Sequence, residues 1–134
     1  MEWFIKCMKN YTIFKGRASR TEFWYFILYW AIFYVFIIGI DRVLGFNFID
    51  ITKLPYSQYI PLANIYEEVG LLTFIYRPLT ILPSLAVMSR RLHDTGRSSW
   101  WCLLCVTPLI FVLIFFLCNK GDEDDNLFGK KPIA

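Results

Sequence analysis

The chain contains one histidine, His93, and it is followed directly by Asp94. A histidine beside a carboxylate is a pairing that general bases and metal sites use. A metal site needs three or four ligands, and no second cluster of ligand residues accompanies this pair. Asp94-Thr95-Gly96 also matches the tripeptide of aspartic proteases, but that mechanism requires two carboxylates in one site. We therefore interpret His93 and Asp94 as side chains that hydrogen-bond within a turn.

The cysteines offer little more chemistry. Cys102 and Cys105 form a C-x-x-C pair, which indicates redox chemistry or zinc binding in soluble proteins. Here the pair lies inside an uncharged apolar segment, residues 100–118, so we expect two small packing residues. Cys7 and Cys118 stand alone and predict no disulfide framework. The sequence thus predicts no catalytic residue, no cofactor site and no metal site, and it favours a protein that is not an enzyme.

The elements that hold these residues are predicted by the distribution of charge. Hydrophobic residues make up 57% of the 134 and charged residues 19%, whereas soluble domains average roughly 45 to 50% and 25%. Residues 23–40 and 100–118 carry no charge, and residues 69–88 carry only Arg77. A spanning helix needs about 20 mostly apolar residues. We therefore predict an all-α membrane protein with three transmembrane helices in a single domain.

Capping patterns set the ends of the predicted spans. Ser19 stands three residues before Glu22, which is the spacing of a capping box. Asn64 stands at the same distance before Glu67, ahead of the second apolar segment. In chain order we predict an interfacial helix at residues 1–16, a first span at 19–41 and an extracytoplasmic loop at 42–64. A second span at 65–89, a cytoplasmic basic hairpin at 90–98, a third span at 99–118 and a polar tail at 119–134 follow.

Prolines interrupt two of these spans. Pro78 and Pro83 fall in the second span and Pro108 falls in the third. Each removes a backbone donor and clashes with the preceding turn, so both helices are predicted to be kinked. Such kinks are tolerated in membranes.

The N-terminal segment before the first span has a different pattern. Its apolar residues recur on one helical face and its lysines fall elsewhere. The apolar residues are Trp3, Phe4, Cys7, Met8, Tyr11 and Phe14. An amphipathic helix of this kind suits the membrane interface. It also suits packing on the protein's own bundle, and the two placements are compatible.

The cytoplasmic side is predicted from the positions of lysine and arginine. With the N-terminus inside, eight of these residues face the cytoplasm, five face the other side, and Arg77 lies in the membrane. Cations close to span ends weigh most in the positive-inside bias. We therefore expect a cytoplasmic N-terminus and an extracytoplasmic C-terminus. The alternative is that Pro108 breaks the third span into a re-entrant hairpin, which would return the tail to the cytoplasm.

Arg77 is the one charge deep inside a predicted span. It lies eleven residues from Met88, about 16 Å at 1.5 Å per residue. A charge at the bilayer centre costs roughly 2.5 to 3.5 kcal/mol on insertion scales. Arg77 could be an intramembrane functional charge that binds an anion or gates a pore. We favour a structural role, in which it extends outward or pairs with Asp41, Glu67 or Glu68.

Several motifs along the chain resemble one family. They are Met1-Glu2-Trp3, Lys9-Asn10-Tyr11, residues 14–24, Pro83, the R-R-L-H-D-x-x-R-S block at residues 90–98, Trp100-Trp101, residues 125–129 and Pro132. Together they resemble the domain-of-unknown-function 805 family of YhaH-like small bacterial inner-membrane proteins over nearly the whole length. The resemblance implies a multi-pass protein of the bacterial inner membrane and no particular activity. Two departures are a longer loop at residues 41–64 and the charge at Arg77.

Two functions fit these predictions. The first is a structural or regulatory membrane protein whose basic cytoplasmic turns bind a protein partner or anionic lipid headgroups, where each cation gains about 1 kcal/mol. The candidate interaction or ion-network residues are Arg17, Arg20, Glu22, Arg90, Arg91, His93, Asp94 and Arg97. The alternative is a subunit of a small oligomeric transporter or channel that uses Arg77. Neither function requires a cofactor or a nucleic acid, and a homo-oligomer is compatible with both.

Overall fold

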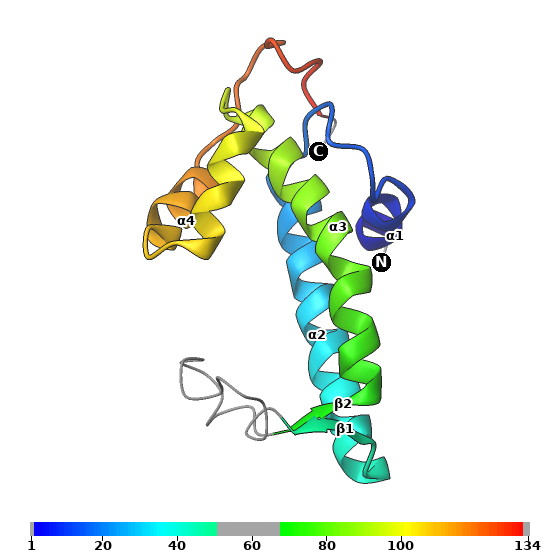
Figure 1. The fold of residues 1–134 in the computed structure, drawn as a ribbon. Helices are drawn as coiled ribbons and strands as arrows, with labels where there is room; N and C mark the ends of the chain where they lie inside the picture. The colour runs from blue at the N-terminus through cyan, green and yellow to red at the C-terminus, as the bar shows by residue number, and fades with distance from the viewer. Residues whose placement is uncertain (1, 51–67, 133–134) are drawn as a thin grey trace. The chain divides into compact units, whose positions relative to one another are not determined.

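The computed structural model describes residues 2–50 and 68–132, and this part of the chain is mostly helical, as predicted. In chain order the elements are α1 (Glu2–Lys9), α2 (Arg20–Leu44), β1 (Asn47–Asp50), β2 (Glu68–Gly70), α3 (Leu71–Asp94), the 3-10 helix η3 (Ser99–Val106) and α4 (Ile110–Cys118) (Figure 1). They form two compact units. The cap unit contains the chain up to Tyr29 and again from Ile81, and the mid-helix unit is Trp30–Thr80.

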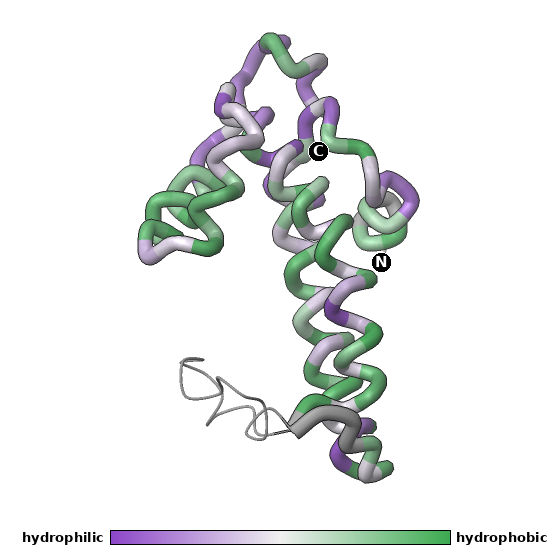
Figure 2. Tube along the Cα trace, in the orientation of Figure 1, coloured by the Kyte–Doolittle hydropathy of each residue, from purple (hydrophilic) through white to green (hydrophobic). Residues whose placement is uncertain are grey.

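Two of the helices, α2 and α3, are long and apolar enough to cross a membrane. They contain 25 and 24 residues, or roughly 36 to 38 Å at 1.5 Å per residue, against a hydrocarbon core of about 30 Å. Apolar residues predominate along both in Figure 2. Only 11% and 28% of their most apolar windows are buried, whereas the core helix of a soluble protein would be mostly buried. The first two predicted spans are therefore helices of spanning length.

The start of α2 follows from its capping residue. The Ser19 hydroxyl accepts a hydrogen bond from the Glu22 backbone N–H at 3.1 Å, which satisfies one of the first-turn amides. This confirms Ser19 as the cap. The helix runs to Leu44, three residues beyond the predicted end, and Gly45 follows it with a left-handed φ of +65°.

The start of α3 differs from the prediction. The helix begins at Leu71 instead of residue 65, and β2 precedes it and pairs antiparallel with β1. Asn64, the predicted cap, lies outside the described residues. Asp41 of α2 fills that role, because its carboxylate accepts hydrogen bonds from the backbone N–H of Leu72 at 3.1 Å and of Thr73 at 2.8 Å.

The end of α3 also lies beyond its predicted position. The helix continues past residue 89 to Asp94, so the cations Arg90 and Arg91 belong to its last turns and not to a hairpin. Gly96 then turns the chain with a left-handed φ of +69°. Pro78 and Pro83 both lie within this helix, and the kinks predicted for them stay a prediction.

The third predicted span is not one continuous helix. η3 ends at Val106 and α4 begins only at Ile110. Pro108 lies in the gap, where its missing N–H prevents a continuous ladder. The two arms turn back on each other, with the Trp101 and Phe116 rings 5.1 Å apart. At about 1.5 to 2 Å per residue each arm alone is shorter than a bilayer, so the prediction of a third spanning helix is not confirmed. We call residues 99–118 the apolar hairpin.

The N-terminal helix is shorter than predicted and packs on α2. α1 ends at Lys9 instead of continuing to Gly16. The Phe4 ring stacks on Phe26 with 5.5 Å between centroids, and Cys7 is fully buried. Packing on the protein's own bundle is thus observed, and the interfacial placement stays a prediction.

The cap unit has a core that is as polar as it is apolar. Its buried apolar residues are Cys7, Ala18, Phe23, Phe26, Ala86, Val87, Leu92, Leu113 and Leu117. Its buried polar residues are Arg17, Ser19, Glu22, Ser89, Arg90, Arg91, His93, Asp94 and Thr95. Burial of so many charged groups is stable only if they are paired. The partners of these groups therefore define the candidate site.

Candidate functional site

Asp94 is the centre of a buried ion network in the cap unit. Its carboxylate accepts from Arg17 Nε at 2.9 Å and from Arg91 Nη1. The side chains of both arginines are fully buried, and that of Asp94 is 6% exposed. Asp94 ends α3 and lies three residues after Arg91, so the helix itself sets that pair. Arg17 comes from the loop before α2, 77 residues away.

The second arginine of the network also binds the end of the apolar hairpin. Arg91 Nε donates to the Leu117 carbonyl at 3.1 Å, and Arg91 Nη2 donates to the Asn119 carbonyl. These carbonyls close α4, where the helix dipole places partial negative charge. A cation buried at this point therefore has both a carboxylate and a helix C-terminus to compensate it.

A second ion pair joins α2, α3 and α1. Arg90 Nη1 lies 2.7 Å from Glu22 Oε1, and both side chains are almost fully buried. The Cys7 thiol of α1 contacts the same carboxylate, with 3.6 Å from Sγ to Oε1. Burial, and then the negative charge of Glu22, raise the pKa of Cys7 to about 12. Cys7 therefore stays a protonated thiol at neutral pH and is a poor nucleophile.

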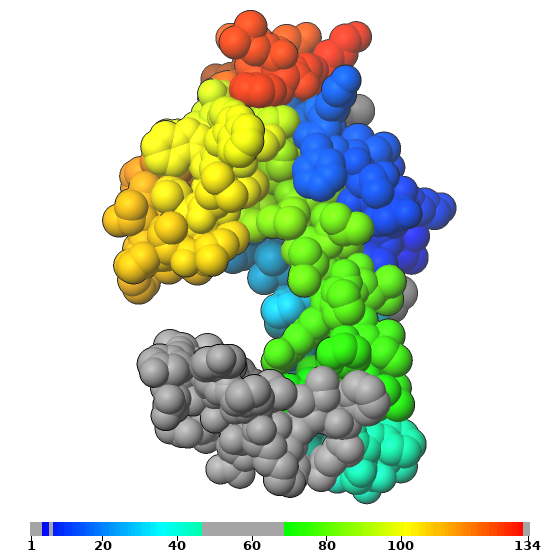
Figure 3. Space-filling view, in the orientation of Figure 1, coloured from blue at the N-terminus to red at the C-terminus, as the bar shows by residue number. Residues whose placement is uncertain are grey.

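Arg17 holds the C-terminal tail against the cap unit. Its terminal nitrogens donate to the carbonyls of Asp122 and Asp124, each at 2.6 Å. Asp122 N–H in turn donates to the Asp94 carbonyl at 2.7 Å. In Figure 3 the tail, in red, lies next to the N-terminal loop before α2, in blue. The tail therefore lies at the same end of the cap unit as the basic turn, and the predicted side of the C-terminus stays a prediction.

His93 acts as a structural link between segments. Nδ1 lies 3.0 Å from the Gly16 carbonyl, which can only accept, so Nδ1 carries the proton. Nε2 then accepts from the Ser99 hydroxyl at 2.8 Å. The ring stacks on Phe128 of the tail, with 4.1 Å between centroids. His93 lies in the last turn of α3 and not in a hairpin. Among the described residues no group of three metal-ligand side chains is present, and the absence of a catalytic or metal-binding role for His93 stays a prediction.

The two remaining candidate cations lie outside this core. Arg20 is exposed and donates through Nε to the Asn119 carbonyl at 3.0 Å. Arg97 is half-buried, donates to the Thr95 carbonyl, and places its guanidinium carbon 4.0 Å from the centroid of the Phe116 ring. Three of the five arginines of the predicted basic surface, Arg17, Arg90 and Arg91, are therefore buried in ion pairs and are not part of the surface.

Several functional positions of the tail had no signal in the sequence. Asn126 donates through Nδ2 to the His93 carbonyl at 2.9 Å. Gly121 is pressed against the network, because a Cβ there would lie 1.9 Å from Asp94 Oδ2. A polar, acidic segment with one glycine reads as a solvated tail. Only the contact with residues 25 or more positions earlier reveals its role.

Arg77 belongs to the mid-helix unit, whereas the ion network belongs to the cap unit. It donates through Nε to the Tyr34 hydroxyl at 3.1 Å, and its guanidinium carbon lies 5.6 Å from the centre of that ring. Tyr34 stacks on Trp30 with 5.3 Å between centroids. Asp41, one of the predicted partners of Arg77, instead uses both carboxylate oxygens to cap α3.

Comparison with known proteins places the chain in a family. The model of the family described as a protein of unknown function, DUF805, matches residues 11–130. The chain belongs to the DUF805 family. It is 42% identical to the inner membrane protein YhaH of Escherichia coli K12 over 98% of this chain and 97% of that protein. It is 38% identical to the inner membrane protein YhaI of the same strain over 98% and 96%. No solved structure matches the chain.

The part of the chain that matches DUF805 contains the ion network. The matched range, residues 11–130, begins before Arg17 and ends after Gly129, whose carbonyl is the last tail contact of Arg17. It excludes α1. Neither DUF805 relative is named as an enzyme, and the absence of catalysis stays a prediction. The sequence-based assignment to DUF805 is confirmed.

Proposed function

We propose that this protein is an integral inner-membrane protein that crosses the bilayer twice, through α2 and α3, with both of its ends in the cytoplasm. Two observations support this topology. Relatives that match nearly the full chain are named inner membrane proteins. The observation that carries the proposal is the clamp of Arg17 on the tail carbonyls, because it holds the segment after α4 at the end where α2 begins.

The distribution of cations supports the same arrangement. With the tail returned, eleven of the fourteen lysines and arginines lie at the cytoplasmic end. They are Lys6, Lys9, Lys15, Arg17, Arg20, Arg90, Arg91, Arg97, Lys120, Lys130 and Lys131. Only Arg42 and Lys53 fall on the opposite side, and Arg77 lies within α3. The positive-inside bias is thus stronger than the eight to five of a three-span topology.

The apolar hairpin then enters the membrane from the cytoplasmic side without crossing it. Residues 100–118 carry no charge, and Trp100, Val106 and Phe111 are between 77% and 84% exposed. Apolar surface of this extent is stable in lipid and not in water. The turn at Pro108 marks the deepest point of the hairpin in this arrangement.

The role that this geometry supports is structural or regulatory. The buried network joins the ends of the two long helices, α1 and the tail into one cap. The cap leaves a set of exposed cations to face the anionic leaflet. Those cations are Lys9, Lys15, Arg20, Lys120, Lys130 and Lys131. We propose anionic lipid headgroups as their partner, at about 1 kcal/mol per cation near the surface.

The topology is tested by cysteine labelling of the full chain in spheroplasts. All four native cysteines are replaced, and one cysteine is introduced as Lys130→Cys in the tail or as Arg42→Cys at the end of α2. A membrane-impermeant maleimide should label Arg42→Cys in intact spheroplasts and Lys130→Cys only after lysis. Labelling of Lys130→Cys before lysis would restore the third crossing.

The lipid role is tested by thermal unfolding of the detergent-solubilised protein. Phosphatidylglycerol should raise the unfolding temperature more than phosphatidylcholine does, and salt near 1 M should remove most of the difference because it shortens the Debye length to about 3 Å. Equal effects of the two lipids would contradict an electrostatic attraction between the exposed cations and anionic headgroups. Salt-sensitive capture of a specific protein on this face would assign the cations to a protein partner.

A second candidate function, a subunit of a small oligomeric transporter or channel, depends on Arg77. The observation that favours it is a half-buried guanidinium hydrogen-bonded to Tyr34 within a helix of spanning length. Ion flux into proteoliposomes that Arg77→Gln abolishes, with no loss of folded protein, would support this function. We expect no flux in either protein, because a guanidinium seated on a tyrosine is explained by structure alone.

A further inference from the structure

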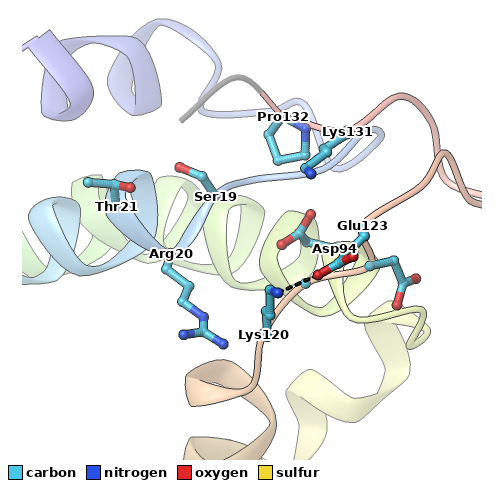
Figure 4. A pocket seen from close by; sticks show the side chains of 10 residues that line it. Ser19, Arg20, Thr21, Asp94, Lys120, Glu123, Lys131 and Pro132 are labelled. Atoms are coloured by element: carbon cyan, nitrogen blue, oxygen red, sulfur yellow. Dashed lines mark hydrogen bonds and ion pairs between the residues drawn. The ribbon is translucent and has the colours of Figure 1, made fainter.

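A polar pocket of about 270 Å³ lies in the cap unit between the start of α2 and the tail (Figure 4). Its charged and hydroxyl lining includes Arg20, Thr21, Asp94, Lys120, Glu123 and Lys131. The three cations come from different segments: the first turn of α2, the residues after α4, and the end of the tail. Such convergence of separate segments forms a site and not only a run of like charges.

The carboxylates that line this pocket are already engaged. Asp94 is held by the two buried arginines described above. Glu123 forms an ion pair with Lys120, and the bond to Lys120 together with the charges of Lys120 and Lys131 lowers its pKa. With Arg17 and Arg91 included, five cations face the three lining carboxylates, which are Asp94, Asp122 and Glu123. The pocket therefore retains a positive charge.

Arg20 retains the groups that would bind an anion. Its Nε donates to the Asn119 carbonyl at 3.0 Å, and this bond fixes the guanidinium beside the pocket. Its two terminal nitrogens make no hydrogen bond to any other described residue. A planar guanidinium with free terminal N–H groups matches the oxygens of a phosphate.

An apolar groove continues from the pocket along α2. This second hollow, of about 360 Å³, is lined by Trp24, Tyr25 and Leu28, and it shares Arg20 and Thr21 with the polar pocket. The three groove residues are 43% to 51% exposed. Leu28 lies eight residues from Arg20, about 12 Å along the helix. Tryptophan and tyrosine near the end of a spanning helix are typical of the membrane interface.

We propose that the pocket and the groove together bind one anionic phospholipid. The phosphate lies against Arg20, Lys120 and Lys131, and the first part of an acyl chain lies along Trp24, Tyr25 and Leu28. Charge complementarity selects the headgroup, and the apolar groove selects a lipid over a free anion. This site rests on the proposed placement of the cap at the cytoplasmic membrane surface, but it adds one saturable lipid to the diffuse attraction of the leaflet.

Native mass spectrometry of the full chain in detergent, titrated with phosphatidylglycerol, tests the pocket. The variant Arg20→Gln/Lys131→Gln should weaken binding of the first lipid about tenfold or more, because each cation near the surface contributes about fivefold. The comparison variant Lys9→Gln/Lys15→Gln removes the same charge from exposed cations of the cap outside the pocket, and it should weaken binding of the first lipid clearly less than Arg20→Gln/Lys131→Gln does. Equal losses in the two variants would overturn the pocket while leaving the electrostatic role of the cap intact.

The groove is tested with a second pair of variants. Leu28→Trp fills the groove and should weaken phosphatidylglycerol binding, whereas Val35→Trp, further along α2, should not. Inorganic phosphate at millimolar concentration should compete poorly. Efficient competition by phosphate with no effect of Leu28→Trp would overturn the lipid and leave a free-anion site. Thermal unfolding controls for folding, and Lys131→Gln alone repeats the test without disturbing the Arg20 contact to Asn119.

Discussion

The cap unit and the mid-helix unit each bury a carboxylate at an end of α3, but they hold it by different means. Asp94 ends α3 in the cap unit and is compensated by the guanidinium groups of Arg17 and Arg91. Asp41 lies at the start of α3 in the mid-helix unit and accepts from neutral donors, the backbone N–H of Leu72 and Thr73 and the Thr73 hydroxyl. As whole residues, Asp94 and Asp41 are each 4% exposed.

The helix dipole explains the difference. The start of a helix presents unpaired N–H groups and partial positive charge, which stabilise a carboxylate without any cation. The end of a helix carries partial negative charge, so a carboxylate buried there needs cations. The lesson is that equal burial does not mean equal sensitivity, because removal of Asp94 strands two buried cations and removal of Asp41 strands only neutral groups.

Asp94→Asn is expected to have the largest effect. It leaves Arg17 and Arg91 buried without their carboxylate, and breaking a buried pair in this way costs about 3 to 5 kcal/mol. Chemical denaturation in detergent measures the loss in the free energy of unfolding. The control is Asp125→Asn, an exposed tail residue, with an expected change within about 0.5 kcal/mol. A loss below about 1 kcal/mol for Asp94→Asn would show that Asp94 is no more sensitive to removal of its charge than Asp41.

Gly121→Ala is expected to destabilise the cap unit next. The added Cβ would lie 1.9 Å from Asp94 Oδ2, and relief of this clash displaces the tail or the carboxylate at a cost of about 1 to 3 kcal/mol. Gly39→Ala is the matched control, because nothing lies within 4 Å of its Cβ position. Alanine within a helix should be neutral or stabilising by up to about 1 kcal/mol. The same denaturation assay compares the two variants.

Asp41→Asn should cost less than either of these changes in the cap unit. The asparagine oxygen can still accept a hydrogen bond at the start of α3, and the loss of a good helix cap costs about 1 kcal/mol. A further variant, Asp41→Ala, separates the cap from the charge. Should Asp41→Asn destabilise as much as Asp94→Asn, the neutral donors around Asp41 would not account for its stability.

The thiol of Cys7 gives the smallest effect near neutral pH. Because burial raises its pKa from 9.0 to about 12, the folded chain keeps a proton that the unfolded chain loses. The resulting stabilisation is complete below about pH 9 and falls as the pH rises toward about 12, by at most about 1.4 kcal/mol per pH unit.

Labelling offers a direct measurement of this thiol. At pH 8 a maleimide should modify Cys7 far more slowly in the folded protein than in denaturant, while Lys130→Cys in the exposed tail should react at similar rates in both. Rapid modification of Cys7 in the folded protein would contradict its burial against Glu22.

Local patterns predicted the features that depend on neighbouring residues. The spacing of Ser19 and Glu22 located the start of α2, and the uncharged runs located both long helices. The cap of α3 was missed because Asp41 acts from 31 residues before Leu72. The apolar hairpin was predicted as a span because residues 100–118 have the composition of a span. Only contacts with Arg91, 26 or more residues earlier, show that its end returns.

The clamp on Arg17 has a consequence for synthesis of the chain. Arg17 leaves the ribosome early, but its partners in the tail, the carbonyls of Asp122, Asp124 and Gly129, follow 105, 107 and 112 residues later. At 5 to 20 residues per second this delay is roughly 5 to 20 s. Until then the guanidinium lacks most of its acceptors, and the cap cannot close. A chain truncated after α4 would therefore keep the ion pair of Arg17 with Asp94 but leave the terminal nitrogens of Arg17 without their acceptors in the tail.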